Sequence, residues 1–324
     1  MAGGQERILR RRIKSVESTK KITRAMELIS ATRVLKAQDR AAAAAPYSEQ
    51  ITAVIHDLIK AGAAKNHPLL RENPDADTRA IICVTSDRGL CGAYNSASMR
   101  MAERAILEAR AEGKKYALIV VGKKAQTYFR FRNFTIDEAF LGVTDRPEYE
   151  QARAIGQAII PRFETGELLS ADITYWRFIS SGTQEIVKRR FLPVELSDAE
   201  SGGPSADLEY EPSPTGILNE ILPRYVDSRI YSALLDASAS EHAARQRAMK
   251  AATDNAEELK TNLSRVMNRA RQDSITTEIM EIVSGAEALG KDKGHRDDLF
   301  PDYLYPEHLF AQQLDYTDHA QERH

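Results

Sequence analysis

Cysteine is scarce in this chain, which has only Cys83 and Cys91 among its 324 residues. The two lie eight positions apart, so they form neither a C-x-x-C pair nor a zinc-ligand pattern. A disulfide-stabilised fold is therefore not expected, and the chain is predicted to occupy a reducing compartment.

Long apolar runs are missing as well. No stretch approaches the roughly 18 apolar residues that a membrane span requires. The first twelve residues are basic, but they lack the apolar block of a signal peptide. We therefore expect a cytoplasmic protein that is held at a membrane, if at all, through partners.

The motifs of nucleotide binding and catalysis are also absent. Gly89-x-x-Gly92 lies after a predicted strand and before a predicted helix, and a helix N-terminus at such a turn can bind the phosphate of a nucleotide. However, neither the Walker pattern nor G-x-G-x-x-G is present. A tight structural turn is the favoured interpretation. The seven histidines are scattered, and there is no G-x-S-x-G elbow. We predict no catalytic residue, no metal site and no bound cofactor in this chain.

Proline is absent from residues 224–289, and Gly285 is the single glycine there. The stretch is rich in strong helix formers. A single helix of that length would reach roughly 100 Å, too long for an ordinary core to cover. Its apolar residues recur close to a period of 3.5 residues, and this period predicts a coiled-coil seam. Asp273 interrupts the pattern. That seam comprises Leu259, Leu263, Val266, Ala270, Thr277 and Met280.

The N-terminal region predicts a second long helix, from Gln5 to about Ala61, with a bend or break near Ala45 caused by Pro46. Its apolar residues again advance by threes and fours. The predicted seam comprises Leu9, Ile13, Val16, Thr19, Ile22, Met26 and Ile29. Two such helices at opposite ends of one chain predict an antiparallel coiled coil, with the middle of the chain inserted between them.

The middle alternates buried-strand and helix patterns, which is typical of a parallel α/β sheet. Strands are predicted over 79–85 and 116–121, a hairpin over 171–180 and 183–194, and helices over 93–110, 123–132 and 148–163. The predicted fold class is α/β, a long antiparallel coiled coil with an inserted Rossmann-like α/β domain. The predicted regions are the N-terminal helix 1–62, the α/β domain and linker 63–217, the C-terminal helix 218–289 and an extension 290–324.

Charge is unevenly spread, although the whole chain carries a formal net charge of only −2. Residues 1–40 hold eleven Lys and Arg against four Asp and Glu, whereas residues 290–324 hold four against eight. The basic start allows an alternative, a coiled-coil protein that binds nucleic acid with a steep salt dependence. A second alternative is an α/β enzyme with helical arms and a ligand cleft near residues 86–92.

Several stretches resemble the gamma subunits of F-type ATP synthases. Residues 9–26, continuing to 36–38, are similar to the opening helix of that family. Residues 240–255, followed by 268–272 and 275–285, are similar to its closing helix, and residues 87–92 and 210–212 also look like family motifs. The similarity covers about residues 4–289 in the correct order, and it disfavours both alternatives.

The resemblance implies a rotor shaft on the cytoplasmic face of the cell membrane, attached there only peripherally through its partners. In this family the coiled coil turns inside a ring of alternating alpha and beta subunits. The α/β domain lies near the epsilon subunit and the membrane proteolipid ring. Proton flow turns the shaft, which drives the catalytic beta subunits through their conformations. ATP, ADP and Mg are then bound by the alpha and beta subunits, not by this chain.

The resemblance also assigns roles to individual residues. Contact with beta-subunit loops is implied for Met26, Arg271, Gln272, Thr276, Glu278 and Glu281. A smooth bearing surface is expected from Ile275, Ile279, Ile282 and Val283, and contact with the proteolipid ring or epsilon from Tyr210 and Glu211. For several of them, such as Met26 and Glu278, plain packing or solvation is the alternative.

The chain departs from the family at two places. Met267 stands where many relatives carry an aromatic residue, which is a modest packing change. Residues 290–324 extend beyond the usual end of the family and are acidic, with interspersed aromatics. This segment is either a disordered extension or a tail whose aromatics dock on the enclosing subunits and restrain rotation.

Overall fold

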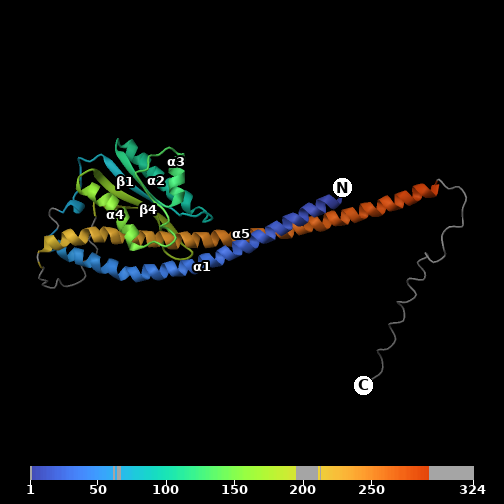
Figure 1. The fold of residues 1–324 in the computed structure, drawn as a ribbon, viewed down its shortest axis with the longest axis horizontal. Coiled ribbons are helices and arrows are strands. Elements are labelled where there is room, and N and C mark those ends of the chain that lie inside the picture. Colours follow the sequence, from blue (N-terminus) through green and yellow to red (C-terminus); the bar gives the residue numbers. More distant parts are fainter. Residues whose placement is uncertain (1, 61–62, 64–66, 195–210, 212, 292–324) are drawn as a thin grey trace, which may run out of the picture. The chain divides into compact units, whose positions relative to one another are not determined.

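A computed structural model describes residues 2–60, 63, 67–194, 211 and 213–291 of the chain. Two long helices, α1 (Ala2–Lys60) and α5 (Pro214–Lys291), hold its two ends. A five-stranded sheet with three helices is inserted between them (Figure 1). The predicted fold class is confirmed, whereas the exact boundaries given for the four regions stay predictions. The extension 292–324 and the linker around 197–207 lie outside the described residues.

The sheet has the strand order β3-β2-β1-β4-β5. Strands β1 (Thr78–Val84), β2 (Lys115–Val121), β3 (Glu138–Phe140) and β4 (Leu168–Phe178) are parallel, and β5 (Gln184–Leu192) closes an antiparallel hairpin with β4. The predicted strands and hairpin are therefore present. The short β3 and a 3-10 helix η2 (Pro68–Leu70) were not expected, since neither has a clear apolar pattern.

Alternate side chains of the central strands face two different cores. Ile81 and Cys83 point to helices α2 (Tyr94–Ala111) and α3 (Lys123–Phe131). Ala80, Ile82 and Val84 point to α4 (Tyr149–Glu164) and to the parts of α1 and α5 that the α/β domain covers. The near-continuous apolar runs that predicted these strands follow from this double coverage. The second core joins the domain to the two long helices.

Within residues 14–260, α1 and α5 run antiparallel. Glu17 and Lys20 on α1 pair with Lys260 and Glu257 on α5, and further along Thr23 meets Thr253. Partner numbers fall along α5 as they rise along α1, which confirms the predicted antiparallel coiled coil. The described residues 2–13 and 261–291 belong to a separate unit.

The seam of α1 is shifted from the predicted one. The least exposed side chains recur at strict alternating steps of four and three, as in a heptad. They comprise Leu9, Ile13, Val16, Lys20, Thr23, Glu27, Ser30, Val34 and Ala37. The predicted seam was right as far as Val16, but Thr19, Ile22 and Ile29 are exposed. The prediction failed because it followed apolar residues, whereas this seam is polar from Lys20 to Ser30.

The seam of α5 shows the same kind of shift. Its less exposed positions also alternate in fours and threes, and they comprise Met249, Thr253, Ala256, Lys260, Leu263, Met267, Ala270 and Ser274. Leu263 and Ala270 were predicted correctly. Leu259, Val266, Thr277 and Met280 are exposed, so their assignment to the seam was wrong.

Neither long helix is interrupted by its proline. Helix α1 continues through Pro46, so the chain does not break near Ala45, whereas the predicted bend there stays a prediction; α5 starts at Pro214 and continues through Pro223. A proline removes one backbone hydrogen bond to the residue four positions earlier. Those residues, Ala42 and Asn219, are exposed, so water can reach the freed carbonyls.

Helix α4 packs closely against α5 at Gly156, where a methyl group would overlap the carboxylate of Asp227. Asp227 is buried, and its Oδ1 has no hydrogen-bond partner among the described residues. Burial raises the pKa of Asp227 to about 6. The absence of a side chain at position 156 is therefore a requirement of this helix contact.

We predict that Gly156→Ala lowers the free energy of unfolding by about 1–3 kcal/mol, because the new methyl group must displace packed atoms. Urea unfolding of the full chain, followed by circular dichroism, measures the change. Gly182→Ala is the control, since its nearest neighbour would be Ser180 Oγ at 3.9 Å. Equal losses in the two variants would contradict the close contact.

Candidate partner-contact site

The distal part of α5 presents its side chains to solvent. Every described side chain from Ile275 to Leu289 is exposed, as are Arg271 and Gln272. The sequence-predicted polar contacts Arg271, Gln272, Thr276, Glu278 and Glu281 all lie here. Arg271 and Glu281 form no ion pair with any residue that the structure describes, so both charges are available to a partner.

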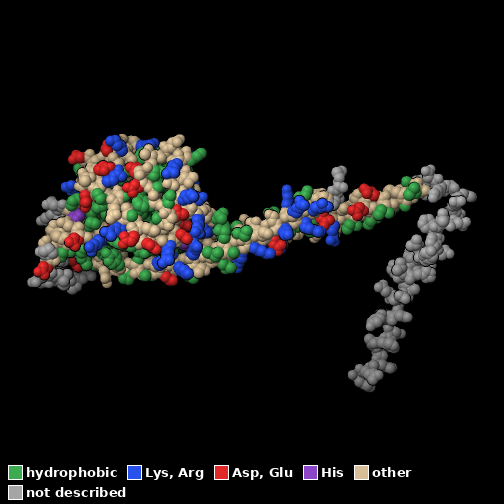
Figure 2. Space-filling model, viewed as in Figure 1, with side chains coloured by type: hydrophobic (Ala, Val, Ile, Leu, Met, Phe, Trp, Pro, Cys, Tyr) green, Lys and Arg blue, Asp and Glu red, His purple; other side chains and the backbone are tan. Residues whose placement is uncertain are grey.

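Figure 2 shows hydrophobic and acidic side chains side by side along the distal end of α5, and the spacing of the candidate residues places both kinds on the same helical stripes. Arg271, Ile275, Glu278 and Ile282 follow one another at steps of four, three and four, and so share one face. Gln272, Thr276, Ile279 and Val283 form the adjacent stripe with the same spacing. The predicted bearing and the predicted polar contacts therefore occupy one continuous surface, to which Glu281 is a neighbour.

The middle of α1 carries an outward apolar face that the sequence interpretation missed. Ile22 and Ile29 are 60% and 54% exposed, and Leu28 and Leu35 are also exposed. In the same segment the polar Glu27 and Ser30 are only 8% and 2% exposed. Polarity is thus inverted, with apolar side chains in solvent and polar ones in the seam. A burial pattern inverted over more than two turns marks a surface made for a partner.

The buried polar groups of this segment are paired inside the chain. Thr253 Oγ1 donates to Thr23 Oγ1 at 2.8 Å, and Arg24 Nη1 donates to both carboxylate oxygens of Glu27 at 2.9 and 3.0 Å. Ser30 donates to the carbonyl of Met26 at 2.7 Å. Satisfied polar groups can remain buried without a large penalty, so the coiled coil holds here without its apolar side chains.

The other predicted contact residues are less informative. Met26 is half-buried beside this face, which fits both packing and partner contact. Glu211 is exposed, and Tyr210 lies outside the described residues. The contact roles of all three stay predictions.

A cluster of five charged or ionisable side chains joins α5 to α1 and to the α/β domain. This anchor cluster comprises Arg33, Asp145, Glu241, His242 and Arg245. Arg245 donates to Glu241 Oε1 at 2.5 Å and lies 3.3 Å from His242 Nδ1. Arg33 pairs with Asp145, whose backbone carbonyl is 3.3 Å from His242 Nε2. Only the spacing of Glu241 and Arg245, four apart, could have revealed part of it from sequence.

Burial and the neighbouring guanidinium groups together shift the pKa values in the anchor cluster. Burial lowers the pKa of His242 to about 4, so the ring is neutral at pH 7. Its Nδ1 then accepts from Arg245, and its Nε2 donates to the Asp145 carbonyl. Burial also raises the pKa of Glu241, an effect that Arg245 opposes. For Asp145 the effect of burial is exceeded by Arg33, and the pKa is lowered.

The anchor cluster is also the one group of three or more metal-ligating side chains found close together among the described residues, through Asp145, Glu241 and His242. Both carboxylates are already paired with guanidinium groups, which repel a cation. We therefore assign the cluster a structural role.

The loop at residues 86–92 is held as a structural turn. Asp87 accepts hydrogen bonds from the backbone amides of Lys123, Gly142 and Thr144, at 3.0 to 3.3 Å. Arg245 Nε donates to the carbonyl of Gly89 at 3.3 Å, which ties the turn to α5. The Asp87 carboxylate thus occupies the backbone amides of Lys123, Gly142 and Thr144, which favours a structural turn over a phosphate-binding one.

Comparison with known proteins decides the family. A family model described as ATP synthase matches residues 5–289. The chain is 48% identical over 293 residues to the ATP synthase gamma chain of Frankia casuarinae, covering 88% of this chain and 98% of that one. The ATP synthase gamma chain of Kineococcus radiotolerans is 44% identical, and the match covers 88% of this chain and 97% of that one. The chain belongs to the ATP synthase gamma chain family.

Solved structures agree on the fold of this family. The chain resembles one from Euglena gracilis mitochondrial ATP synthase with a TM-score of 0.63 at 18% identity, covering 92% of this chain and 100% of that one. A chain from the central stalk and c-ring of Tetrahymena thermophila mitochondrial ATP synthase matches with a TM-score of 0.54 at 21% identity. The match covers 71% of this chain and 99% of that one. At these identities the likeness concerns the fold alone.

Membership in the ATP synthase gamma chain family confirms the expected rotor-shaft role, which is that of a non-catalytic subunit of an ATP synthase. Nothing in the comparisons favours the nucleic-acid-binding alternative. Among the helices that the structure describes, none is long and apolar enough to cross a membrane.

We predict that Arg245→Met destabilises the chain by about 3–5 kcal/mol, because it leaves the buried Glu241 without its cation. Glu241 is 1% exposed, so water cannot replace the guanidinium. Urea unfolding measures the loss, and the double variant Arg245→Met/Glu241→Met should recover much of it. Arg10→Met, which breaks the exposed pair with Glu6, should change stability by less than about 1 kcal/mol. No recovery in the double variant would contradict the pairing.

Proposed function

We propose that the chain works as the rotating shaft of a proton-translocating ATP synthase. Rotation of the membrane proteolipid ring turns α1 and α5 inside a ring of alternating alpha and beta subunits. The changing face that the shaft presents then drives the beta subunits through their catalytic conformations. The chain supplies no catalytic group, and nucleotide and Mg are bound by the alpha and beta subunits.

The inverted polarity of α1 is the observation that supports this proposal most directly. An isolated coiled coil would place Ile22, Leu28 and Ile29 in its seam and polar residues in water. Here the apolar residues are exposed, which is unfavourable for the chain alone and favourable inside a sleeve of other subunits. A smooth apolar face also lacks the directional hydrogen bonds that would hold the shaft at one angle.

The distal stripes of α5 supply the angle-dependent contacts. Arg271, with Gln272 and Glu278 beside it, can exchange charge-assisted hydrogen bonds with beta-subunit loops as the shaft turns. Ile275, Ile279, Ile282 and Val283 separate these groups with apolar surface. Interleaving the two kinds of side chain lets one surface both slide and engage.

The foot of the shaft is the proposed attachment to the membrane sector. Glu211 is exposed just before α5 begins, so it is accessible to the proteolipid ring or to epsilon. We place the chain at the cytoplasmic face of the membrane, held there peripherally by these partners.

The double variant Ile22→Ser/Ile29→Ser tests the apolar face. We expect binding of the full chain to the alpha–beta ring to weaken roughly 10- to 100-fold, since two half-exposed isoleucines lose their burial in the complex. The unfolding midpoint of the isolated chain should hardly change. Surface plasmon resonance against the purified ring measures the affinity.

Ser30→Ala is the matched control, because it alters the buried seam and leaves the outward face intact. It should change the stability of the isolated chain more than its affinity for the ring. A double variant that binds the ring with unchanged affinity would contradict the proposed contact.

Arg271→Ala tests the polar contacts. We expect ATP hydrolysis by the assembled enzyme to fall by about tenfold, the effect of losing one charge-assisted hydrogen bond. Asp273→Ala is the control, since Asp273 lies on the opposite face of the helix. Steady-state ATPase rates measure both variants, and equal rates would overturn the role of Arg271.

A further inference from the structure

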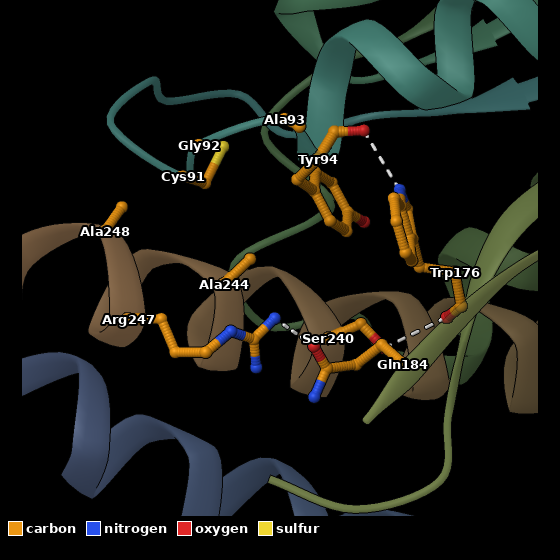
Figure 3. Close-up of a pocket in the computed structure, with 10 residues that line it drawn as sticks. All are labelled: Cys91, Gly92, Ala93, Tyr94, Trp176, Gln184, Ser240, Ala244, Arg247 and Ala248. Carbon is orange, nitrogen blue, oxygen red and sulfur yellow. Dashed lines mark hydrogen bonds between the residues drawn. The ribbon is translucent and has the colours of Figure 1, made fainter. Parts of the chain in front are cut away.

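A cavity of about 300 Å³ opens beside α5, outside the surfaces discussed so far (Figure 3). Its floor is formed by Ser240, Ala244 and Ala248, which lie four residues apart on one face of the helix. Gly92 faces this floor from the loop before α2, with a positive φ of 59°. Small side chains on both sides keep the space open.

An aromatic pair forms the wall of the cavity. The rings of Tyr94 and Trp176 are stacked, with centroids 5.9 Å apart and an interplanar angle of 19°. Trp176 Nε1 donates to the carbonyl of Tyr94 at 2.9 Å, and the Tyr94 hydroxyl donates to the carbonyl of Ala237 at 3.0 Å. Because their polar atoms are satisfied within the fold, the wall is fixed in position and largely apolar.

The rim carries a positive charge. Arg247 is exposed and donates to the carbonyl of Ser181 at 2.9 Å and to the side-chain oxygen of Gln184. Both acceptors are neutral. Arg247 forms no ion pair with a carboxylate in the described part of the chain, so its charge remains uncompensated beside an apolar space. This combination favours a ligand with an apolar body and one negative charge.

We propose that this cavity binds a small planar aromatic carboxylate. The volume lies at the lower end of the range of ligand pockets, which suits a single ring or a fused pair. The ring packs against the aromatic wall and the alanine floor. The carboxylate lies at the rim, where it accepts from the Arg247 guanidinium.

Trp176 makes the test specific, because it is the single tryptophan of the chain. Full-length protein labelled with 5-fluorotryptophan gives one ¹⁹F resonance, which is titrated with benzoate. We expect a saturable shift of this resonance. Benzamide, which has the same shape without the charge, should bind about tenfold more weakly. No saturable shift, or equal binding of the two probes, would overturn the proposal.

Three variants locate the site. Arg247→Gln should weaken benzoate binding about tenfold and leave benzamide binding unchanged. Ala244→Leu should abolish binding of both probes by filling the floor. Arg104→Gln, which removes an exposed arginine elsewhere on the domain, should change neither. Thermal unfolding confirms that each variant is folded, and full benzoate affinity in Ala244→Leu would place the ligand elsewhere.

The same titration is repeated on the assembled enzyme. A shift with similar affinity there supports a site that is open in the working complex. A shift that occurs in the isolated chain and is lost on assembly would show that a partner subunit covers the cavity, and would overturn the small-molecule site. Neither readout depends on ATPase activity, so this result is independent of the shaft contacts.

Discussion

The antiparallel pairing of α1 with α5 is the constraint on which the structure depends. It joins segments about 230 residues apart, such as Thr23 and Thr253, whose hydroxyl groups meet at 2.8 Å. The chain between them must leave the helix pair and return to it. An inserted α/β domain achieves this, because its second core is shared with both long helices. The domain and the coiled coil therefore stabilise one another.

This pairing does not use the most apolar residues of α1. Between Lys20 and Ser30 the seam is polar, and Ile22, Leu28 and Ile29 face outward. Such an arrangement sacrifices stability in the isolated chain, since the burial of an isoleucine contributes about 1.5–3 kcal/mol. In the proposed complex, the same side chains would regain that contribution when other subunits enclose them. A shaft that must turn inside its partners is one of the few roles in which this exchange is useful.

The strands and helices of the α/β domain could be predicted because each has a continuous apolar run or a clear helical period. The two long helices were equally clear from their composition. Their seam could be predicted only in part, because the prediction assumed that apolar residues are buried, and Ile22 and Leu259 are not. The anchor cluster escaped notice for another reason. Arg33, Asp145 and Arg245 are far apart in sequence, and only the fold brings them together.

The anchor cluster adds contacts that depend on direction, which apolar packing alone does not provide. Apolar contacts are nearly indifferent to small rotations of one helix against its neighbours, whereas hydrogen bonds and ion pairs depend on direction. Arg245 bonds along α5 to Glu241 and across to Gly89 of the domain, and His242 reaches Asp145, which Arg33 of α1 holds. Rotation of α5 about its own axis would break the two contacts that leave this helix, from Arg245 to Gly89 and from His242 to Asp145. In the proposed shaft, these directional contacts would fix α5 to the α/β domain and, through Asp145 and Arg33, the domain to α1.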